Sequence, residues 1–424
     1  MSNQTFHNTR SKTRKIAHNL FRSAALGTST IALTACTISM MNSGGSQTTK
    51  HCEPTGTVFV EPVPGPEILH SVYTAPAPGV DGWPVANLND AGFDPEQIND
   101  MLAAIKNGHY SGINSVLVVR NGTLVFEAYF NGFDRKTPHN IRSAFKSFTS
   151  TLAGISLDKG LIGSVHQPIS GFFPDRWAAT ARGDRQKEEI TLAHLLTMQA
   201  GFNRHRGLDD ADDWYRFALD QPMGAAPGTR FDYSDGNSML IGGAIASAAG
   251  IPLTEFAKAN LFAPMGIRHF CWTLTPTGQP MTDGSFYMRP RDFAKLGQLY
   301  LDEGRWQGRQ IVSADWVKKA IRERVLFSPP TKRKLHMNYG YHWWIRHLAP
   351  TDDNRLEMFA ASGGSQKLVV YPNLKLVVAF TGGRYFGWEA HQQPWKILDR
   401  YILPALVGEQ AATTITGISR KSPS

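Results

Sequence analysis

Two hairpin signals near opposite ends of the 424-residue chain constrain its fold more than any other feature. Val116–Arg120 and Thr123–Phe130 are rich in β-branched and aromatic residues, and Asn121-Gly122 lies between them. Both turn residues tolerate the positive φ that a two-residue hairpin turn needs, so this segment predicts two paired strands. Lys367–Thr381, with Asn373–Lys375 as its turn, predicts a second hairpin.

The stretch between these hairpins has helical patterning. Helices that end near a glycine are expected at Leu192–Met198, Ser238–Ala249 and Pro290–Glu303. Strands at both ends with helices between them favour an α+β architecture, in which an antiparallel sheet is flanked by helices and a mostly helical lobe is inserted. We expect the α/β lobe at about 86–157 and 285–407 and the helical lobe at about 158–284, with the ligand site in a cleft between them.

The first 35 residues have the layout of a secretory signal peptide. They hold five basic residues and no acidic residue, and an apolar run, Ser23–Leu33, follows the basic region. Leu33-Thr34-Ala35-Cys36 resembles the lipobox of bacterial lipoproteins, in which the cysteine is acylated. We therefore expect export, either to the periplasmic face of a bacterial membrane through a lipid anchor at Cys36 or as a secreted protein. A plain secretory signal and a disordered leader are the alternatives.

Residues 36–85 are rich in Ser, Gly, Thr and Pro and are expected to form a flexible tether, whereas residues 408–424 are expected to be a disordered tail. The body of the chain is then 86–407. Three cysteines are too few for a disulfide framework. If Cys36 is acylated, Cys52 and Cys271 are left. An exported location permits a bond between them, but their spacing does not establish one.

The net charge of +9 suggests a nucleic-acid partner only until the charge is placed along the chain. The first 35 residues carry +5, and the remaining 389 carry only +4 without a basic patch, so nucleic-acid binding is not expected. No run of 18 apolar residues occurs, which excludes a multi-pass membrane protein. The chain has no Gly-x-Ser-x-Gly, His-Glu-x-x-His or phosphate-loop motif, and neither a metal nor a cofactor is expected.

A candidate nucleophile stands at the start of a predicted amphipathic helix, Asn140–Ile155. Ser143 and Lys146 are three residues apart, which places both side chains on one helical face. A serine hydroxyl needs an adjacent base, and a lysine can be that base where burial disfavours its charged form. Ser156–Lys159 repeats the same spacing, so the spacing alone does not select Ser143.

Further blocks follow Ser143 in a definite order. Counted from the first, they are Ser143–Thr149, Ile190–Gly201, Pro227–Asp235, Met288–Gly297, Tyr339–Trp344 and Ala361–Gln366. Together they resemble the motifs of the serine β-lactamase and penicillin-binding-protein superfamily, above all its class C-like branch with small esterases and 6-aminohexanoate-dimer hydrolases. The resemblance covers about residues 90–400, and six blocks in the right order are far more specific than any one of them.

The resemblance implies roles for the site residues. Ser143 is expected to become acylated, Lys146 to accept or relay its proton, and Tyr233 to act as the partner base with a phenol acidified by the nearby lysine. The backbone N–H of Ser143 and one from the Gly363–Gln366 strand edge are expected to form the oxyanion hole, with Gly363 and Gly364 among the candidate oxyanion or substrate-binding residues. The implied reaction is acyl transfer to serine followed by attack of water, and which base acts first stays open.

The second of these motifs departs from the family pattern at Asp235, where an asparagine is usual. A carboxylate accepts hydrogen bonds but does not donate them, which puts its role in holding a substrate carbonyl in doubt. An ionised Asp235 is expected to stabilise Lys146 as an ammonium and so to make it a worse base. Asn237, two residues on, is the candidate for the missing amide.

The third motif departs further. Ala361-Ser362-Gly363 stands where penicillin-directed members carry Lys-Thr-Gly. In those members the lysine helps to hold a substrate carboxylate, so its loss argues against efficient penicillin or cephalosporin turnover and points to neutral substrates. Ser362 keeps a hydroxyl that can contact substrate or Tyr233, although a plain turn is the alternative.

The sequence therefore predicts an exported serine hydrolase that cleaves small carboxylic esters or amides. A β-lactamase or D,D-peptidase activity is the alternative, and a catalytically silent module that binds cell wall or protein is the alternative of another class. Elsewhere, Trp343 and Trp344 are expected in the core or the cleft wall, and Lys295 on the solvated face of its helix.

Overall fold

The computed structural model describes residues 48–54, 72–180, 183–203, 207–326, 337–347, 356–383 and 387–406. The expected signal peptide, the lipidation site Cys36 and the expected tail 408–424 lie outside these residues. Among the described helices, no single one has the length and apolar composition to cross a membrane, and one pair, Asp235–Ala249 with Leu253–Phe262, meets that test only jointly and is bent by 84°.

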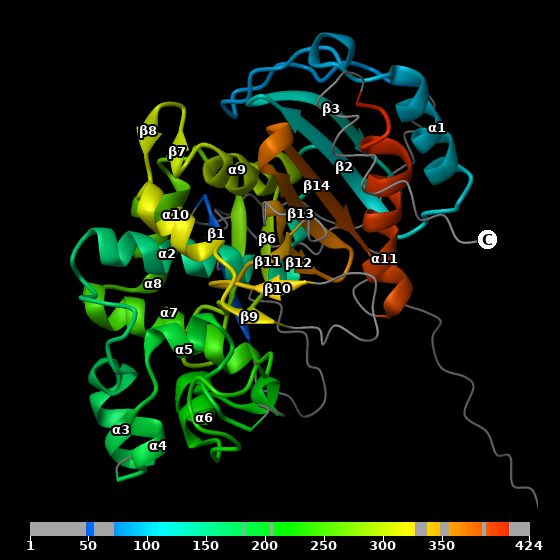
Figure 1. Ribbon diagram of the computed structural model, residues 1–424. Coiled ribbons are helices and arrows are strands. Elements are labelled where there is room, and N and C mark those ends of the chain that lie inside the picture. The colour runs from blue at the N-terminus through cyan, green and yellow to red at the C-terminus, as the bar shows by residue number, and fades with distance from the viewer. Residues whose placement is uncertain are drawn as a thin grey trace, which may run out of the picture. The chain divides into compact units, whose positions relative to one another are not determined.

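Within the described residues, eight antiparallel strands form the main sheet. In spatial order they are β3 (Thr123–Tyr129), β2 (Ile113–Arg120), β14 (Leu376–Gly382), β13 (Gln366–Tyr371), β12 (Leu356–Gly363), β11 (Trp344–His347), β10 (Asn338–Tyr339) and β9 (Val325–Leu326). Both predicted hairpins are confirmed, and Asn121 and Gly122 have φ of 51° and 77°. β14 pairs with β2, with Val378 opposite Val118, so the sheet is assembled from both ends of the chain (Figure 1).

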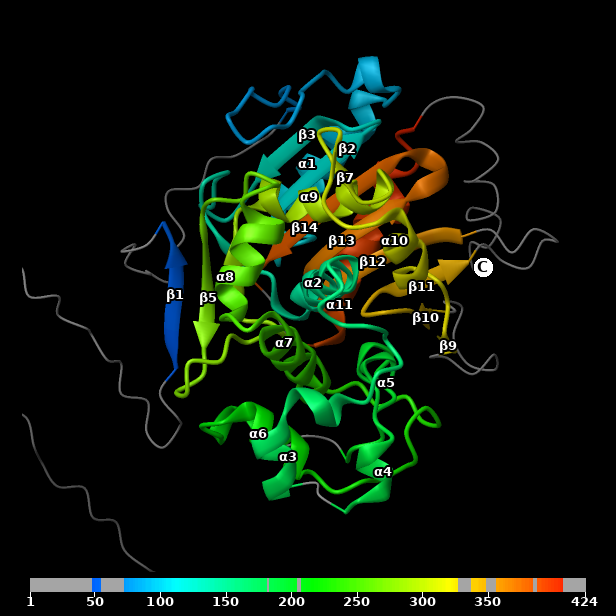
Figure 2. The ribbon, with the colours of Figure 1, turned by 90° about the vertical axis from the view of Figure 1, so that its left-hand side faces the viewer.

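Helices cover both faces of this sheet (Figure 2). The bounds of the described helices, those of the inserted region included, are α1 (Pro95–Lys106), α2 (Lys146–Asp158), α3 (Pro174–Thr180), α4 (Arg185–Glu188), α5 (Leu192–Leu196), α6 (Trp214–Asp220), α7 (Asp235–Ala249), α8 (Leu253–Ala257), α9 (Pro290–Leu301), α10 (Ala314–Ala320) and α11 (Trp388–Ile397). α2 and α9 share an apolar core with Leu117 and Val377, whereas α1 and α11 share another with Val118 and Val378. This alternation along the strands gives the sheet two buried faces.

The predicted insertion of helices between strands is confirmed, whereas the bounds of the two lobes stay a prediction. α3 to α8 follow one another between the strands β4 (His139–Asn140) and β5 (Phe270–Leu274). α7 begins three residues earlier than predicted, at Asp235, and it ends as predicted where Gly250 takes a left-handed conformation. The expected α+β fold is therefore correct, and the site residues lie where α2, α7 and β12 meet.

A second sheet corrects part of the tether predicted over residues 36–85. β1 (Thr49–Glu53) pairs with β5, which pairs with β6 (Phe286–Met288), which pairs with β4. A disulfide joins Cys52 to Cys271 across the β1–β5 pair. Farther on, Trp83 is buried and its indole N–H donates to the Arg291 carbonyl at 3.0 Å. These ordered segments could not be recognised in a polar and proline-rich stretch. One edge strand and one buried tryptophan are too short to produce a periodic pattern of apolar residues.

Lys295 corrects a second expectation. Its side chain is 0 % exposed, and its Nζ lies 2.7 Å from Asp292 Oδ1, one turn earlier on α9. The Trp306 ring lies over it at 5.6 Å. The amphipathic pattern of the helix predicted solvent on this face, but a partner carboxylate and an aromatic ring make burial of the ammonium tolerable.

Candidate active site

Ser143 lies in a short 3-10 turn, Arg142–Phe145, that connects β4 to α2. The entry to this turn is fixed by backbone and side-chain bonds: Ile141 N donates to Phe286 O at 2.9 Å, and Arg142 N donates to Asn140 Oδ1 at 2.9 Å. Arg142 has a φ of 52°, a region that costs a non-glycine residue about 1 kcal/mol or more. The chain thus turns sharply just before Ser143 and leaves its side chain partly exposed at the start of a helix.

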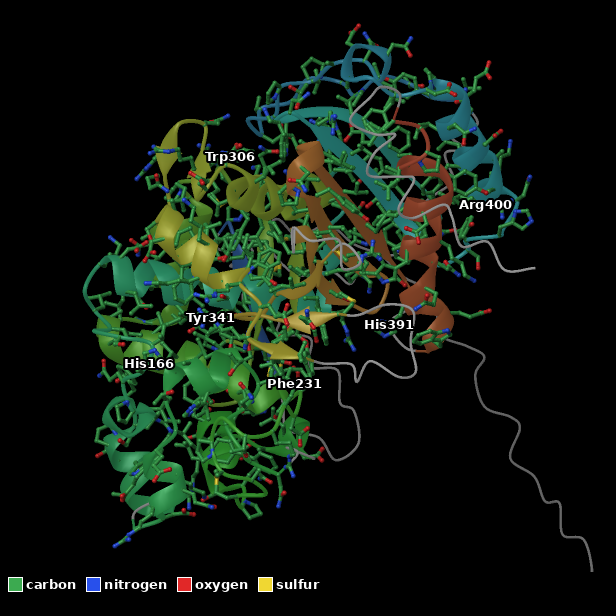
Figure 3. The ribbon with its side chains drawn as sticks, in the orientation of Figure 1. His166, Phe231, Trp306, Tyr341, His391 and Arg400 are labelled. Atoms are coloured by element: carbon green, nitrogen blue, oxygen red, sulfur yellow. A yellow bond between two sulfur atoms is a disulfide. The ribbon has the colours of Figure 1, made fainter. Side chains whose placement is uncertain are left out.

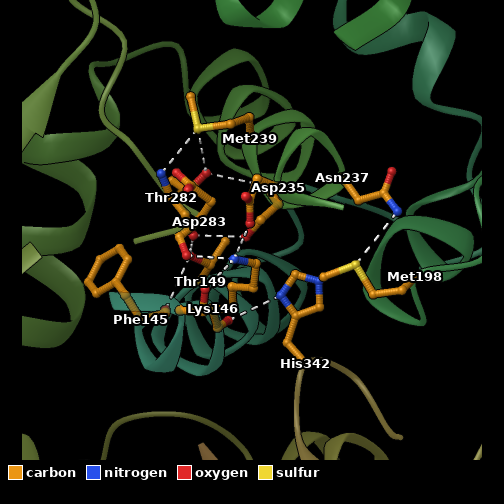
Figure 4. A network of polar contacts seen from close by, with 12 residues as sticks. Phe145, Lys146, Thr149, Met198, Asp235, Asn237, Met239, Thr282, Asp283 and His342 are labelled. Carbon is orange, nitrogen blue, oxygen red and sulfur yellow. Dashed lines mark hydrogen bonds and ion pairs between the residues drawn. The ribbon is translucent and has the colours of Figure 1, made fainter. Parts of the chain in front are cut away.

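Lys146 lies in a closed polar environment, with Asp235 and Asp283 on one side and His342 on another (Figure 4). Its side chain is 1 % exposed, and its Nζ donates to Ser143 Oγ at 3.1 Å, to Asp235 Oδ1 at 2.6 Å and to the Asp283 carbonyl at 2.6 Å. These acceptors match the three N–H groups of an ammonium. The predicted reach between Ser143 and Lys146 is confirmed.

The charge on Lys146 follows from these partners. Burial disfavours the ammonium, but the Asp235 carboxylate, Tyr233 and Asp283 outweigh burial and raise the pKa of Lys146 above its ordinary value. The predicted effect of Asp235 is therefore confirmed: the carboxylate, 51 % exposed, holds Lys146 as a cation. A lysine held in this way is a poor proton acceptor near neutral pH.

Tyr233 approaches the same two groups from the segment just before α7. Lys146 Nζ lies 5.1 Å from its ring centroid, and hydrogen bonds with the Ser143 and Lys146 side chains act on its phenol. Its ring stacks on Trp344 with centroids 6.0 Å apart and planes at 19°. Phe231, labelled in Figure 3, lies against the same tryptophan. Trp344 is thus part of the site wall, and Trp343 is buried in the core, as predicted.

The expected acidity of Tyr233 is wrong in its net direction. Burial raises the pKa of the phenol, the Lys146 cation lowers it, and Asp235 raises it again, so that the pKa lies above its ordinary value. The asparagine usual in the second motif would not add this last contribution, because an amide carries no charge. An aspartate in place of the usual asparagine at position 235 therefore raises the pKa of both candidate bases, Lys146 and Tyr233.

The end of β12 lies directly against the Ser143 turn. A Cβ added to Gly363 would stand 2.6 Å from Ser143 N and 3.0 Å from Ala144 N, so only glycine permits this approach. Gly364 follows with a φ of 63° and starts the tight turn into β13. The structure thus brings the backbone of Gly363 and Gly364 to the serine, where the sequence placed the oxyanion hole.

Two candidate substrate-binding residues do not join this group. Alternation along β12 turns Ser362 to the opposite face from Gly363, on the side of its cross-strand partner Lys367. Asn237 lies on α7 with its Nδ2 3.6 Å from Met198 Sδ, away from Lys146 (Figure 4). It therefore does not supply the missing amide beside Lys146.

Two groups that contact Lys146, the Asp283 carbonyl and the His342 side chain, were not predicted from the sequence. The Asp283 carbonyl is a backbone acceptor, for which no side-chain pattern exists. His342 is buried, its Nδ1 lies 3.3 Å from Lys146 O and its Nε2 3.3 Å from Leu195 O, and burial lowers its pKa to about 3. The neutral imidazole thus lies between α2 and α5, and its one N–H donates to one of the two carbonyls, according to the tautomer. Its sequence signal, a histidine before two tryptophans, does not distinguish this role from ordinary packing.

The chain was also compared with known proteins. The family model described as Beta-lactamase matches residues 99–399. Similar curated proteins include a 6-aminohexanoate-dimer hydrolase of Paenarthrobacter ureafaciens, 25 % identical over 252 residues, which are 54 % of this chain and 64 % of that protein. A beta-lactamase of Pseudomonas fluorescens is 28 % identical over 193 residues, 42 % of this chain and 50 % of that protein. These matches therefore span between half and two thirds of the relatives' own length.

A solved structure extends the likeness to the fold. The class C beta-lactamase from Rhodobacter sphaeroides is 18 % identical, with a TM-score of 0.57 over 72 % of this chain and 99 % of that one. At this identity the likeness concerns the arrangement of the elements and not the chemistry.

Proposed function

The chain belongs to the beta-lactamase family of serine hydrolases, and from that premise we propose that it cleaves small carboxylic esters or amides through an acyl-enzyme at Ser143. The observation that carries the proposal is the convergence of three side chains from two separate segments. Ser143 Oγ lies 3.1 Å from Lys146 Nζ, the Tyr233 ring centroid lies 5.1 Å from the same nitrogen, and the Ser143 and Lys146 side chains both act on the pKa of the Tyr233 phenol. A serine hydroxyl beside two groups that can carry its proton has what nucleophilic catalysis requires.

The mechanism follows from the charges. Because Asp235 holds Lys146 as an ammonium, we assign the proton of Ser143 to Tyr233, which reacts through the small phenolate fraction that its raised pKa leaves. The serine oxygen attacks the carbonyl, and the backbone N–H groups of Ser143 and Gly364 hold the oxyanion. The phenol then gives its proton to the leaving alcohol or amine as the acyl bond breaks. Water attacks the acyl-enzyme with the phenolate again as base, and the carboxylic acid leaves.

The substrate class follows from what the third motif lacks. Ala361 is buried in the core beside Leu368 and offers no cation for a substrate carboxylate. Neutral esters and amides are therefore favoured over penicillins. The relative from Paenarthrobacter ureafaciens is named for hydrolysis of an aminohexanoate dimer, and this supports an amide or ester substrate here.

Turnover of p-nitrophenyl butyrate compared with that of nitrocefin tests the substrate class. We expect kcat/KM to be at least about a hundredfold higher for the ester, which corresponds to nearly 3 kcal/mol of transition-state discrimination. Comparable values for the two substrates would show that the site needs no cation at position 361. Failure of the folded protein to turn over either substrate, or to be labelled by a fluorophosphonate, would favour the silent binding module.

We propose in addition that the protein is exported and anchored through Cys36. The disulfide between Cys52 and Cys271 supports an oxidising location, since such bonds persist outside the reducing cytoplasm. Radiolabelled palmitate should label the wild type and not Cys36→Ser. A Cys36→Ser protein that is exported but released from the membrane would agree with the anchor, and unchanged membrane association would contradict it.

Replacement of Asp235 by asparagine should move the pH profile. Asp235 raises the pKa of Tyr233, so removing its charge lowers that pKa and extends the phenolate to more acidic solution. The acidic limb of kcat/KM for p-nitrophenyl butyrate should therefore move to lower pH in Asp235→Asn. Asp232→Asn is the matched control, because Asp232 pairs with Arg230 at 3.6 Å instead of with Lys146. An unmoved acidic limb in Asp235→Asn would assign the base to another group.

A further inference from the structure

A second buried lysine lies close to the site and has no part in the mechanism above. Lys367, on β13, is 1 % exposed, and its Nζ donates to the carbonyl of Gly364. Burying an ammonium is costly, so a lysine in such a place needs a reason. The acceptor of its hydrogen bond, the Gly364 carbonyl, lies in the turn next to Ser143 and supplies that reason.

The hydrogen bond from Lys367 to Gly364 lies within the turn between β12 and β13. Gly363 pairs with Gln366, so that Gly364 and Ser365 form a two-residue turn. On its far side the turn is fastened to β14, because Gln366 Nε2 donates to Gly382 O at 2.6 Å and Gly382 N donates to Gln366 Oε1 at 3.2 Å. Lys367 holds the carbonyl of the peptide that follows Gly364, and the peptide that precedes Gly364 begins at Gly363, which lies against Ser143 N.

We propose that Lys367 is a positioning residue for the oxyanion hole: its hydrogen bond to the Gly364 carbonyl holds the backbone conformation of Gly364, and through it the direction of the Gly364 N–H in the preceding peptide. This inference rests on the proposed serine-hydrolase function. An oxyanion-hole donor acts only when it points to where the charge develops, so a tilted peptide at Gly364 weakens the transition state and leaves substrate binding intact. Lys367 touches neither substrate nor nucleophile and acts through the turn.

The charge of Lys367 strengthens the argument from geometry. Burial lowers the pKa of its ammonium to about 7, so both protonation states occur near neutral pH. The charged form makes the stronger bond to a carbonyl. Its neighbours on the flanking strands, Ser362 and Phe380, do not titrate in this range. His391 of α11, labelled in Figure 3, is near enough for the Lys367 charge, together with burial, to lower the pKa of its imidazole.

The test compares Lys367→Met with a matched control, Lys187→Met. Lys187 is likewise buried, and its Nζ donates to the Leu219 carbonyl at 2.7 Å, but it lies on α4 in the helical region. For p-nitrophenyl butyrate, Lys367→Met should lower kcat about 10- to 100-fold with KM within twofold of the wild type. Its inhibition constant for phenylboronic acid, which forms a tetrahedral adduct with serine, should rise by a similar factor. Lys187→Met should change neither value beyond twofold.

The ratio of wild-type to Lys367→Met kcat should also depend on pH. It should be larger at pH 6 than at pH 8.5, because the ammonium is lost as pH rises through about 7. The comparison is repeated in a His391→Gln background, which removes the titratable neighbour. A merely structural lysine predicts a ratio that does not change with pH.

Two outcomes overturn the inference: a Lys367→Met protein that keeps its kcat and its phenylboronic acid affinity within twofold, or a ratio that is constant with pH. Should Lys367→Met not fold, Lys367→Gln, which keeps a donor without the charge, takes its place with the same expected direction. A wild type that neither turns over the ester nor is labelled by a fluorophosphonate contradicts the proposed function instead, so the two failures are distinguishable.

Discussion

Ser143→Ala should lower kcat/KM for p-nitrophenyl butyrate by at least about a thousandfold, because it removes the hydroxyl that we propose carries the acyl group. Ser143 is partly exposed at the mouth of the Lys146 environment, and its Oγ accepts from Lys146 Nζ at 3.1 Å. Labelling by a fluorophosphonate should also disappear. Steady-state kinetics and gel fluorescence measure the two effects separately.

The chain supplies its own control for this variant. Ser156 and Lys159 have the same spacing as Ser143 and Lys146, but the Ser156 hydroxyl donates to the Ala153 carbonyl at 2.7 Å inside the helix. Ser156→Ala should therefore keep its activity within about threefold of the wild type, since a surrounding of backbone carbonyls does not activate a hydroxyl. Loss of activity in Ser156→Ala together with retention in Ser143→Ala would move the nucleophile to the second copy.

Tyr233→Phe should reduce kcat about 100- to 10,000-fold, the contribution of a positioned proton carrier. The variant keeps the ring that stacks on Trp344 at 6.0 Å and removes only the hydroxyl. Because Lys146 is already held as an ammonium by Asp235, the lysine does not replace the lost phenolate. KM should change little, since the hydroxyl serves the transition state more than the bound substrate.

Tyr339→Phe is the matched control for Tyr233→Phe. Tyr339 belongs to the same aromatic cluster, with its ring centroid 6.3 Å from that of Tyr233, and it is buried. Removal of the Tyr339 hydroxyl should change the free energy of unfolding more than it changes kcat. If Tyr233→Phe retains more than a tenth of the wild-type kcat, Lys146 must act as the first base despite its partners, and the charge assignment of the site is wrong.

Much of the architecture could be read from local sequence patterns. Asn121-Gly122 fixed the first hairpin because few residue pairs accept positive φ at both positions. Gly250 fixed the end of α7 for the same reason. The pairing of β1 with β5 could not be read, since the two strands are 219 residues apart at the disulfide and each is too short to carry a pattern.

The site was predictable where its chemistry lies in side chains of one motif and not where it depends on tertiary contacts. The spacing of Ser143 and Lys146 gave their proximity, whereas the net rise in the pKa of Tyr233 results from burial, which no motif encodes. Asn237 illustrates the opposite error: it lies only two residues beyond Asp235, yet helical rotation directs it to Met198. Lys367 lacks a sequence signal because alternation does not predict a buried cation.

The most direct test is the mass of the acyl-enzyme itself. The wild-type protein is mixed with an excess of p-nitrophenyl butyrate, quenched in acid within milliseconds to seconds, and analysed by intact-protein and peptide mass spectrometry. A butyryl adduct on the peptide that contains Ser143, absent from Ser143→Ala, is the predicted result. An adduct on a different residue, or ester turnover by the folded protein with no adduct at any quench time while Ser143→Ala remains active, would contradict acylation of Ser143.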